Sequence, residues 1–206
     1  MKTLKIAVLL SGSGTTMQNL MDRIREGKLN ARIVIAIADR ANTRGLERAS
    51  EAGIPTALVP REQSATLTEF SERIFGQCRQ SQADLVVMGG FLRLIQVPQD
   101  FENKVINIHP SLIPAFCGKG FHGLNVHRAV IDAGNKVTGC TIHFADNIYD
   151  HGPIIMQCPV QVLDDDTPET LMKRVFEEEC RAYPEVIQLF AQGKLRVEGR
   201  RVRILS

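Results

Sequence analysis

An amide and an imidazole stand two residues apart in the apolar run KVINIH (residues 104–109). Residues two apart in a strand face the same side, so Asn107 and His109 share one face, at the carboxyl end where open α/β sheets place ligand crevices. An amide N–H can stabilise a developing oxyanion, and an imidazole can move protons near neutral pH. The pair therefore indicates either a catalytic site or a strand-end histidine held by structural hydrogen bonds.

A glycine-rich segment, SGSGTT (residues 11–16), follows the first apolar run and precedes a helical pattern. Glycines let the backbone approach a ligand closely, and a helix N-terminus offers free N–H groups and a positive dipole end. Met17 stands where a dinucleotide-binding loop has its third glycine, and the chain has no Gly-Lys-Ser/Thr of a P-loop. We expect a single phosphate monoester here, with a tight turn that binds no ligand as the alternative.

Carboxylates stand at two further places of interest. A long helix is expected over residues 168–193, and Glu179 lies on its apolar seam. A carboxylate there is costly unless paired, so a ligand contact and an ion pair with an arginine are both open. Asp146 and Asp150 lie in the loop between two late strands, where either could pair with an imidazole or serve as an ordinary turn residue.

Metal and nucleic-acid sites are disfavoured by spacing. His122 and His127 lack the i, i+4 spacing of a helical zinc pair, and no HExxH is present. We interpret the acidic residues 164–166 as a helix cap, the basic tail as an exposed hairpin face, and His143 as a core or edge residue. The five cysteines are scattered without a CxxC, so we expect neither a zinc ribbon nor a disulfide framework.

The elements that must position these residues alternate between apolar strand patterns and amphipathic helices. Strands are expected at 4–10, 32–39, 55–59, 83–90, 104–109, 136–145 and 153–162, and helices at 15–27, 44–53, 67–80, 123–134 and 168–193. Alternation predicts a Rossmann-like α/β fold, with a mostly parallel twisted sheet and helices on both faces. The short connection between the last two strands predicts an antiparallel pair. The tail predicts a small hairpin near Glu198 and Gly199, and residues 1–206 are expected to form a single domain.

Composition narrows the class of protein. The 206 residues carry a net charge of +2, with 44% hydrophobic and 23% charged residues, which is ordinary for a globular chain and gives no general attraction to nucleic acid. The apolar runs are too short to span a bilayer, and the N-terminus does not resemble a signal peptide. We expect a cytoplasmic protein that acts on small molecules, as a monomer or homodimer.

Four segments, SGSGTTMQNL, GGFLRL, NIHPSLIP and HFADNIYDHGPIIMQ, resemble in order and spacing the phosphoribosylglycinamide formyltransferase family. The resemblance runs from residue 5 to about residue 192 and implies the formyltransferase fold. It also implies transfer of a formyl group from 10-formyltetrahydrofolate, as co-substrate, to glycinamide ribonucleotide, without a metal. A formyltetrahydrofolate hydrolase and a non-catalytic protein that binds a phosphate ligand are the alternatives.

The resemblance also assigns roles to individual residues. Those that match the family's catalytic positions are Asn107, His109 and Asp150. Those that match its substrate site are Gly14, Thr15 and Thr16 for the phosphate and Glu179 for the ribose. Those that match its folate site are Leu92, Arg93, Leu94, Ile95, Asn107, Asp146 and Asn147. His151 stands where the family usually has a small residue, so it could compete for the Asp150 carboxylate.

The mechanism implied by these roles begins with attack of the neutral amine on the formyl carbon. Asn107 and protonated His109 are expected to stabilise the tetrahedral oxyanion, after which His109, aided by water, returns a proton to N10 of the folate. Asp150 is expected to hold the imidazolium and to keep the pKa of His109 high.

Overall fold

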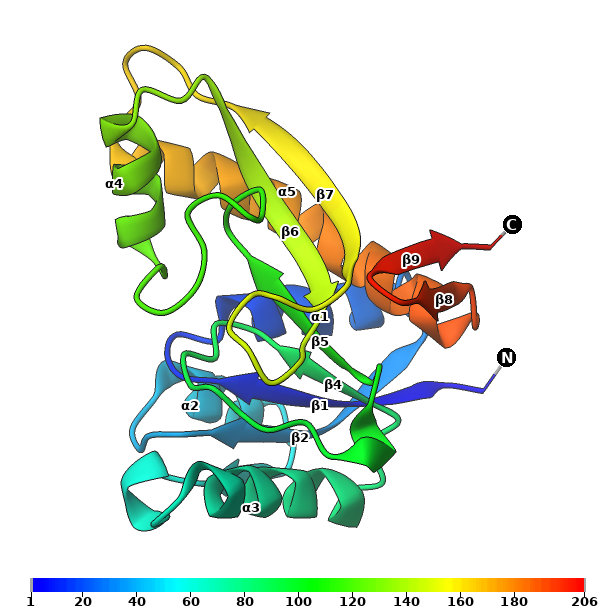
Figure 1. Ribbon diagram of the computed structural model, residues 1–206. Helices are drawn as coiled ribbons and strands as arrows, with labels where there is room; N and C mark the ends of the chain where they lie inside the picture. The colour runs from blue at the N-terminus through cyan, green and yellow to red at the C-terminus, as the bar shows by residue number, and fades with distance from the viewer. Residues whose placement is uncertain (1, 206) are drawn as a thin grey trace. The chain divides into compact units, whose positions relative to one another are not determined.

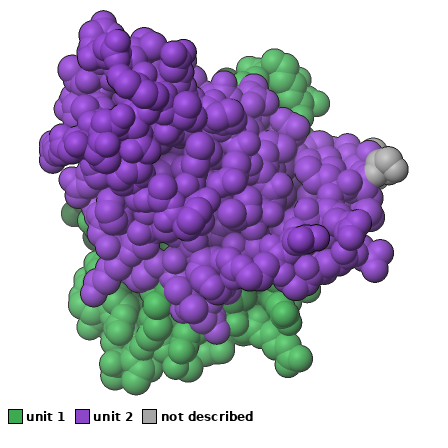
Figure 2. All heavy atoms as spheres, turned by 45° about the horizontal axis from the view of Figure 1, so that its top comes forward, with its two compact units in different colours: residues 1–106 green, residues 107–206 purple. Residues whose placement is uncertain are grey.

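The computed structural model describes residues 2–205 and contains two compact units, residues 1–106 (unit 1) and residues 107–206 (unit 2). Figure 1 labels the helices and strands, and Figure 2 colours the two units separately. The glycine-rich segment belongs to unit 1, and the Asn107–His109 pair belongs to unit 2. A single domain over residues 1–206 stays a prediction.

Unit 1 is a parallel sheet with helical crossovers. Its elements are β1 (Leu4–Leu10), α1 (Thr15–Arg25), β2 (Ala31–Ala38), α2 (Arg44–Glu51), β3 (Thr56–Leu58), α3 (Leu67–Gln80) and β4 (Leu85–Met88). The strands lie in the order β3-β2-β1-β4, and the pairs β1–β2, β1–β4 and β2–β3 are parallel. The chain adds β2 and β3 on one side of β1 and then returns to place β4 on the other side. Right-handed crossovers therefore place α1 and α2 on one face of the sheet and α3 on the other.

Hydrophobic burial explains why the strands of unit 1 form. Every residue of β4 is buried, and so is every residue of β1 except Lys5, as expected for a sheet covered on both faces. Thr43 and Thr66 cap α2 and α3 through their side chains. Since parallel strands end at one edge, residues 11–16, Asp39 and residues 89–95 emerge together at the carboxyl edge of this sheet.

Unit 2 begins within a strand and combines antiparallel pairs with a long helix. Its elements are β5 (Val105–His109, which starts in unit 1), α4 (Leu124–Asp132), β6 (Val137–Phe144), β7 (Ile154–Gln161), α5 (Pro168–Ala191), β8 (Leu195–Glu198) and β9 (Arg201–Ile204). β6 pairs antiparallel with β7, β8 pairs antiparallel with β9, and β9 joins β7 in parallel. Helix α5 packs against β6, β7 and α4.

These elements confirm the predicted α/β fold with a late antiparallel pair. The tail forms the expected hairpin, and Thr167, not the acidic residues 164–166, is the N-cap residue of α5. Thr167 forms a capping box with Thr170, and α5 continues through Pro184. Within residues 2–205, no helix is long and apolar enough to cross a membrane.

Candidate active site

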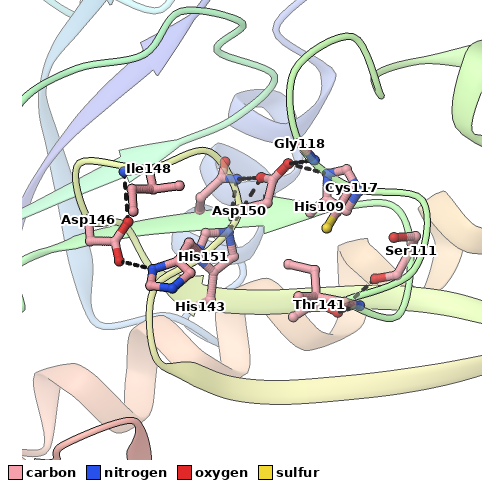
Figure 3. A network of polar contacts seen from close by, with 12 residues as sticks. His109, Ser111, Cys117, Gly118, Thr141, His143, Asp146, Ile148, Asp150 and His151 are labelled. Atoms are coloured by element: carbon pink, nitrogen blue, oxygen red, sulfur yellow. Dashed lines mark hydrogen bonds and ion pairs between the residues drawn. The ribbon is translucent and has the colours of Figure 1, made fainter.

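Asp150 is the centre of a polar cluster in unit 2, in which Figure 3 shows His109 and His143 and to which Asn107 also belongs. Asn107 Nδ2 donates to Asp150 Oδ1 at 3.3 Å, and His109 Nδ1 lies 3.5 Å from Asp150 Oδ2. The two side chains of β5 therefore point to one carboxylate, which confirms that they share a face of the strand. The same-face argument located two members of this cluster, and the family resemblance located the third.

The loop after β6 fixes the Asp150 carboxylate. Asp150 has a positive φ of 51°, which is uncommon for a residue other than glycine, so the surrounding contacts must hold it. The backbone N–H of Gly118 donates to Asp150 Oδ2 at 2.8 Å. Loop 110–123 and loop 145–153 thus meet at this side chain.

His143 is the member of the cluster that the sequence interpretation missed. Its Nδ1–H donates to the carbonyl of Phe144 at 2.8 Å, which leaves Nε2 as an acceptor for Asn107 Nδ2 at 3.2 Å. His143 Nε2 also lies 3.7 Å from Asp150 Oδ1. The signal for it was its place at the carboxyl end of the strand next to β5, but β-alternation alone also fits a core residue.

Burial and neighbouring polar groups shift the pKa of His109 in opposite directions, and the same holds for Asp150. Burial lowers the pKa of His109, and the Asp150 carboxylate only partly opposes this effect, so the expectation of a high pKa is not met. For Asp150, burial raises the pKa, but His143, His109 and the Gly118 N–H together outweigh burial and hold the pKa below its usual value. The site therefore favours a carboxylate beside a neutral imidazole.

The geometry around His109 nevertheless suits an imidazolium as well. His109 Nε2 lies 2.9 Å from the carbonyl oxygen of Phe116, and Nδ1 faces Asp150. Both ring nitrogens therefore face oxygen acceptors, so a proton gained by the ring would be hydrogen-bonded at once. This arrangement lets one residue take up a proton and release it again.

Side-chain hydrogen bonds of Ser111 and Thr141 hold loop 110–123 next to His109. The Ser111 hydroxyl donates to the carbonyls of Ala115 at 2.6 Å and Phe116 at 3.3 Å. The Thr141 hydroxyl donates to the Ser111 carbonyl at 2.7 Å, and the loop contains a cis peptide bond between Ile113 and Pro114. These contacts present the Phe116 carbonyl to His109.

His151 does not compete for Asp150. Its Nδ1 lies 2.7 Å from Asp146 Oδ2, and Arg200 contacts both its Nε2, at 3.0 Å, and its carbonyl, at 2.8 Å. Asp146 also accepts from the backbone N–H of Ile148 at 2.9 Å. His151 therefore closes loop 145–153 onto itself and ties it to the β8–β9 hairpin, while Asp150 stays with His109.

In unit 1, the predicted anion loop lies at the start of α1. Gly14 is the N-cap residue, with a φ of 70°, and no side chain caps the helix. A Cβ on Gly14 would lie 2.6 Å from the Cα of Gly45 near the start of α2, so only glycine fits. Thr15 is exposed and Thr16 half-buried, with N–H groups and hydroxyls in the first turn. The loop is thus suited to an oxyanion.

The segment predicted to line the folate site also lies at this edge of unit 1. The Ser11 hydroxyl accepts from the Leu92 N–H at 3.0 Å, and the Ser11 N–H donates to the Gly90 carbonyl at 3.1 Å. Arg93 pairs with Asp39 at 2.7 Å. Ile95 is buried, while Leu92 is exposed. The glycine loop and this segment are therefore held together by Ser11.

Glu179 lies in α5 of unit 2 without an arginine partner. Burial alone shifts its pKa, and no cation contributes, so the described residues show no ion pair of Glu179 with an arginine. Burial raises the pKa of Glu179 to about 7, and burial together with the Glu179 charge raises the pKa of the Cys140 thiol nearby. An unpaired carboxyl of this kind is suited to a hydrogen bond with a ligand hydroxyl.

The acidic run before α5 does not itself cap the helix, because Thr167 is the N-cap residue and accepts from the Thr170 N–H. Asp166 accepts from Thr170 and pairs with Arg174, and its pKa is held far below its usual range by that guanidinium. Asp164 pairs with Lys136 at the surface. Within residues 2–205, no group of three or more His, Cys, Asp or Glu side chains is arranged to hold a metal ion.

Comparisons with known proteins agree with this geometry. The formyl transferase family model matches residues 4–187. The trifunctional purine biosynthetic protein adenosine-3 of Gallus gallus is 40% identical over 195 residues, which are 94% of this chain and 19% of that protein. The chain thus spans about a fifth of the length of such trifunctional relatives.

Two further relatives match along nearly their whole length. The phosphoribosylglycinamide formyltransferase of Haemophilus influenzae is 35% identical over 94% of this chain and 90% of its own. The crystal structure of glycinamide ribonucleotide transformylase 1 from Symbiobacterium toebii superposes with a TM-score of 0.93 at 43% identity, covering 100% of this chain and 95% of that one. The chain therefore belongs to the formyl transferase family.

Proposed function

We propose that this chain transfers the formyl group of 10-formyltetrahydrofolate to the amine of glycinamide ribonucleotide. The observation that carries the proposal is the convergence of Asn107, His109 and His143 on Asp150, which supplies an N–H donor and a proton carrier in one cluster. The names of the full-length relatives support the substrates. The product is N-formylglycinamide ribonucleotide, a step of purine synthesis.

The proposed reaction forms one C–N bond and breaks another. The amine lone pair attacks the formyl carbon, and the electron pair of the carbonyl moves to oxygen. Neutral His109 takes the proton that the amine loses, and the new imidazolium lies against Asp150. When the tetrahedral intermediate collapses, the bond to N10 of the folate breaks and His109 returns the proton to N10.

Asn107 is proposed to stabilise the oxyanion. Its Nδ2 atom lies 3.2 Å from His143 Nε2 and 3.3 Å from Asp150 Oδ1. The developing oxyanion would replace the weaker of these contacts, and His143 would keep the amide oriented. One such donor typically contributes on the order of 10²–10³ in rate.

The remaining candidate residues are proposed to bind the two substrates. The first turn of α1, with Gly14, Thr15 and Thr16, would hold the substrate phosphate. Glu179 would accept or donate a hydrogen bond to the ribose. Residues 92–95, with Asp146, Asn147 and Asn107, would contact the pterin of the folate.

The test is the loss of 10-formyltetrahydrofolate over time, with and without glycinamide ribonucleotide. We expect consumption only when the ribonucleotide is present, with one formylated product formed per folate consumed. Equal consumption without the ribonucleotide would make the chain a hydrolase. No consumption in either case would leave a binding protein and overturn the catalytic roles.

A further inference from the structure

Asp39 is a buried carboxylate that the proposed chemistry leaves without a role. It follows β2 at the carboxyl edge of unit 1, and its side chain is 0% exposed. Its Oδ2 accepts from Arg93 Nε at 2.7 Å. Its Oδ1 has no hydrogen-bond partner among the described residues, and the Arg40 guanidinium approaches it only to 3.6 Å.

A buried carboxylate is costly unless a cation and hydrogen bonds compensate for the lost water. Arg93 supplies this compensation through a short charge-assisted bond, although its own side chain is 42% exposed. Breaking this bond would leave both carboxylate oxygens of Asp39 buried without a hydrogen-bond partner. The pair therefore holds the Arg93 side chain in one direction, at the edge of unit 1 that the proposed function assigns to ligand binding.

The backbone around Arg93 depends on such contacts because residues 89–98 form neither a helix nor a strand. Ser11 fixes the start of this segment at Gly90 and Leu92. The Ser71 hydroxyl accepts from the Gln96 N–H at 2.8 Å and fixes the far end. Asp39 supplies a side-chain contact between these two anchors.

We propose that Asp39 is a positioning residue for residues 92–95, acting through Arg93 and not through the substrate. Its carboxylate sets the course of the segment that the proposed function assigns to the pterin, so this inference rests on that function. Loss of the pair is expected to loosen the folate site and to leave the phosphate loop and the Asp150 cluster intact.

The test compares Asp39→Asn, which keeps the shape and removes the charge, with Asp100→Asn. Asp100 is the control because it forms a two-point ion pair with Arg79 at the surface of the same unit, beyond the end of residues 89–98 and outside the contacts of Ser11, Asp39 and Ser71 that anchor them. We expect Asp39→Asn to raise the KM for 10-formyltetrahydrofolate about tenfold, the loss typical of one hydrogen bond to a charged group. The KM for the ribonucleotide and kcat should stay within about twofold, and Asp100→Asn should change neither KM.

A double-mutant cycle separates positioning from direct contact. If Asp39 acts only through Arg93, Arg93→Ala and the double variant should have the same folate KM, because the second change has nothing left to remove. If the two substitutions instead raise the folate KM by factors that multiply in the double variant, Asp39 contacts the ligand itself and the proposal is overturned. Arg93→Lys keeps a cation if Asp39→Asn folds poorly, and it should give a folate KM between those of the wild type and Arg93→Ala.

A binding measurement distinguishes failure of this inference from failure of the proposed function. Calorimetric titration with tetrahydrofolate needs no turnover, and we expect Asp39→Asn to bind it about tenfold more weakly than the wild type. Wild-type affinity and wild-type folate KM in the variant would overturn the positioning role alone. A wild-type protein that neither binds tetrahydrofolate nor transfers the formyl group would overturn the proposed function.

Discussion

At the scale of single residues, His109 is the group on which the proposed chemistry depends. We expect His109→Ala to lower kcat on the order of 10²–10³, because the ring is the proton carrier beside Asp150. Binding of the ribonucleotide phosphate should be unchanged, because the phosphate is proposed to contact Gly14, Thr15 and Thr16 and not His109. Steady-state kinetics with equilibrium binding checks both, with His122→Ala, an exposed histidine of loop 110–123, as control. Near-normal turnover in His109→Ala would remove the assignment.

Glu179 makes a prediction about stability and pH. Burial raises its pKa from about 4.5 to about 7, so the folded protein prefers the protonated form. Stability is lost as the pH rises between these values, and the full penalty, at most about 3 kcal/mol, applies above pH 7. We expect Glu179→Gln to be more stable than the wild type at pH 8 and equal to it near pH 4.

Urea titrations at both pH values measure this difference. Glu177→Gln, an exposed neighbour on α5, is the control and should show no such pH dependence. A Glu179→Gln variant that is destabilised equally at both pH values would mean that the carboxyl makes a stabilising contact in the folded state.

The residues of the site differ in how far the sequence could predict them. Asn107 and His109 could be paired because β-alternation is local, and Asp150 could be added only by resemblance. His143 and Asp39 could not be assigned, because their partners Asn107 and Arg93 are far away in the sequence. The downward shift in the pKa of His109 could not be predicted either, since it depends on burial.

At the scale of elements, the start of α5 shows how a short acidic run stabilises a helix. Asp166 accepts from the Leu163 N–H and pairs with Arg174, which holds its pKa well below the unfolded value. This contribution is present above the unfolded pKa and is lost as the pH falls through the folded one. We expect Asp166→Asn to lower the free energy of unfolding by about 1–2 kcal/mol at pH 7.

Urea unfolding at pH 7 and in acid measures the effect, which should shrink as Asp166 of the wild type becomes protonated. Asp164→Asn is the matched control, because Asp164 is 91% exposed and pairs only with Lys136. A loss of the same size in Asp164→Asn would attribute the effect to net charge near the helix and not to the contacts of Asp166.

The elements themselves were largely predictable because their signals are local. Continuous apolar runs predicted β1 and β4, and Thr167 with Pro168 predicted the start of α5. Loop 110–123 was not predictable, since its course depends on Ser111 and Thr141 and on the contact with His109. The role of His151 likewise depends on Arg200, which lies in the turn between β8 and β9.

At the scale of the whole molecule, alternation of strands and helices predicted the fold class but not the strand order of unit 1. The order β3-β2-β1-β4 brings the ends of β1, β2 and β4 to one edge, where Ser11 and Asp39 then organise the segment after β4. The family resemblance added the substrates, which no pattern of burial or charge could supply.

The close approach of Gly14 and Gly45 has an electrostatic consequence. It sets the N-termini of α1 and α2 side by side, and each carries about half a positive charge, so two like poles repel in the free protein. A bound dianion would convert this repulsion into attraction.

Millimolar inorganic phosphate should therefore raise Tm saturably, by more than chloride of equal ionic strength, as differential scanning calorimetry would show. Equal Tm values in the two salts would contradict this. The substrate phosphate would then help to hold these two helices together, and the protein would be most stable with its substrate bound.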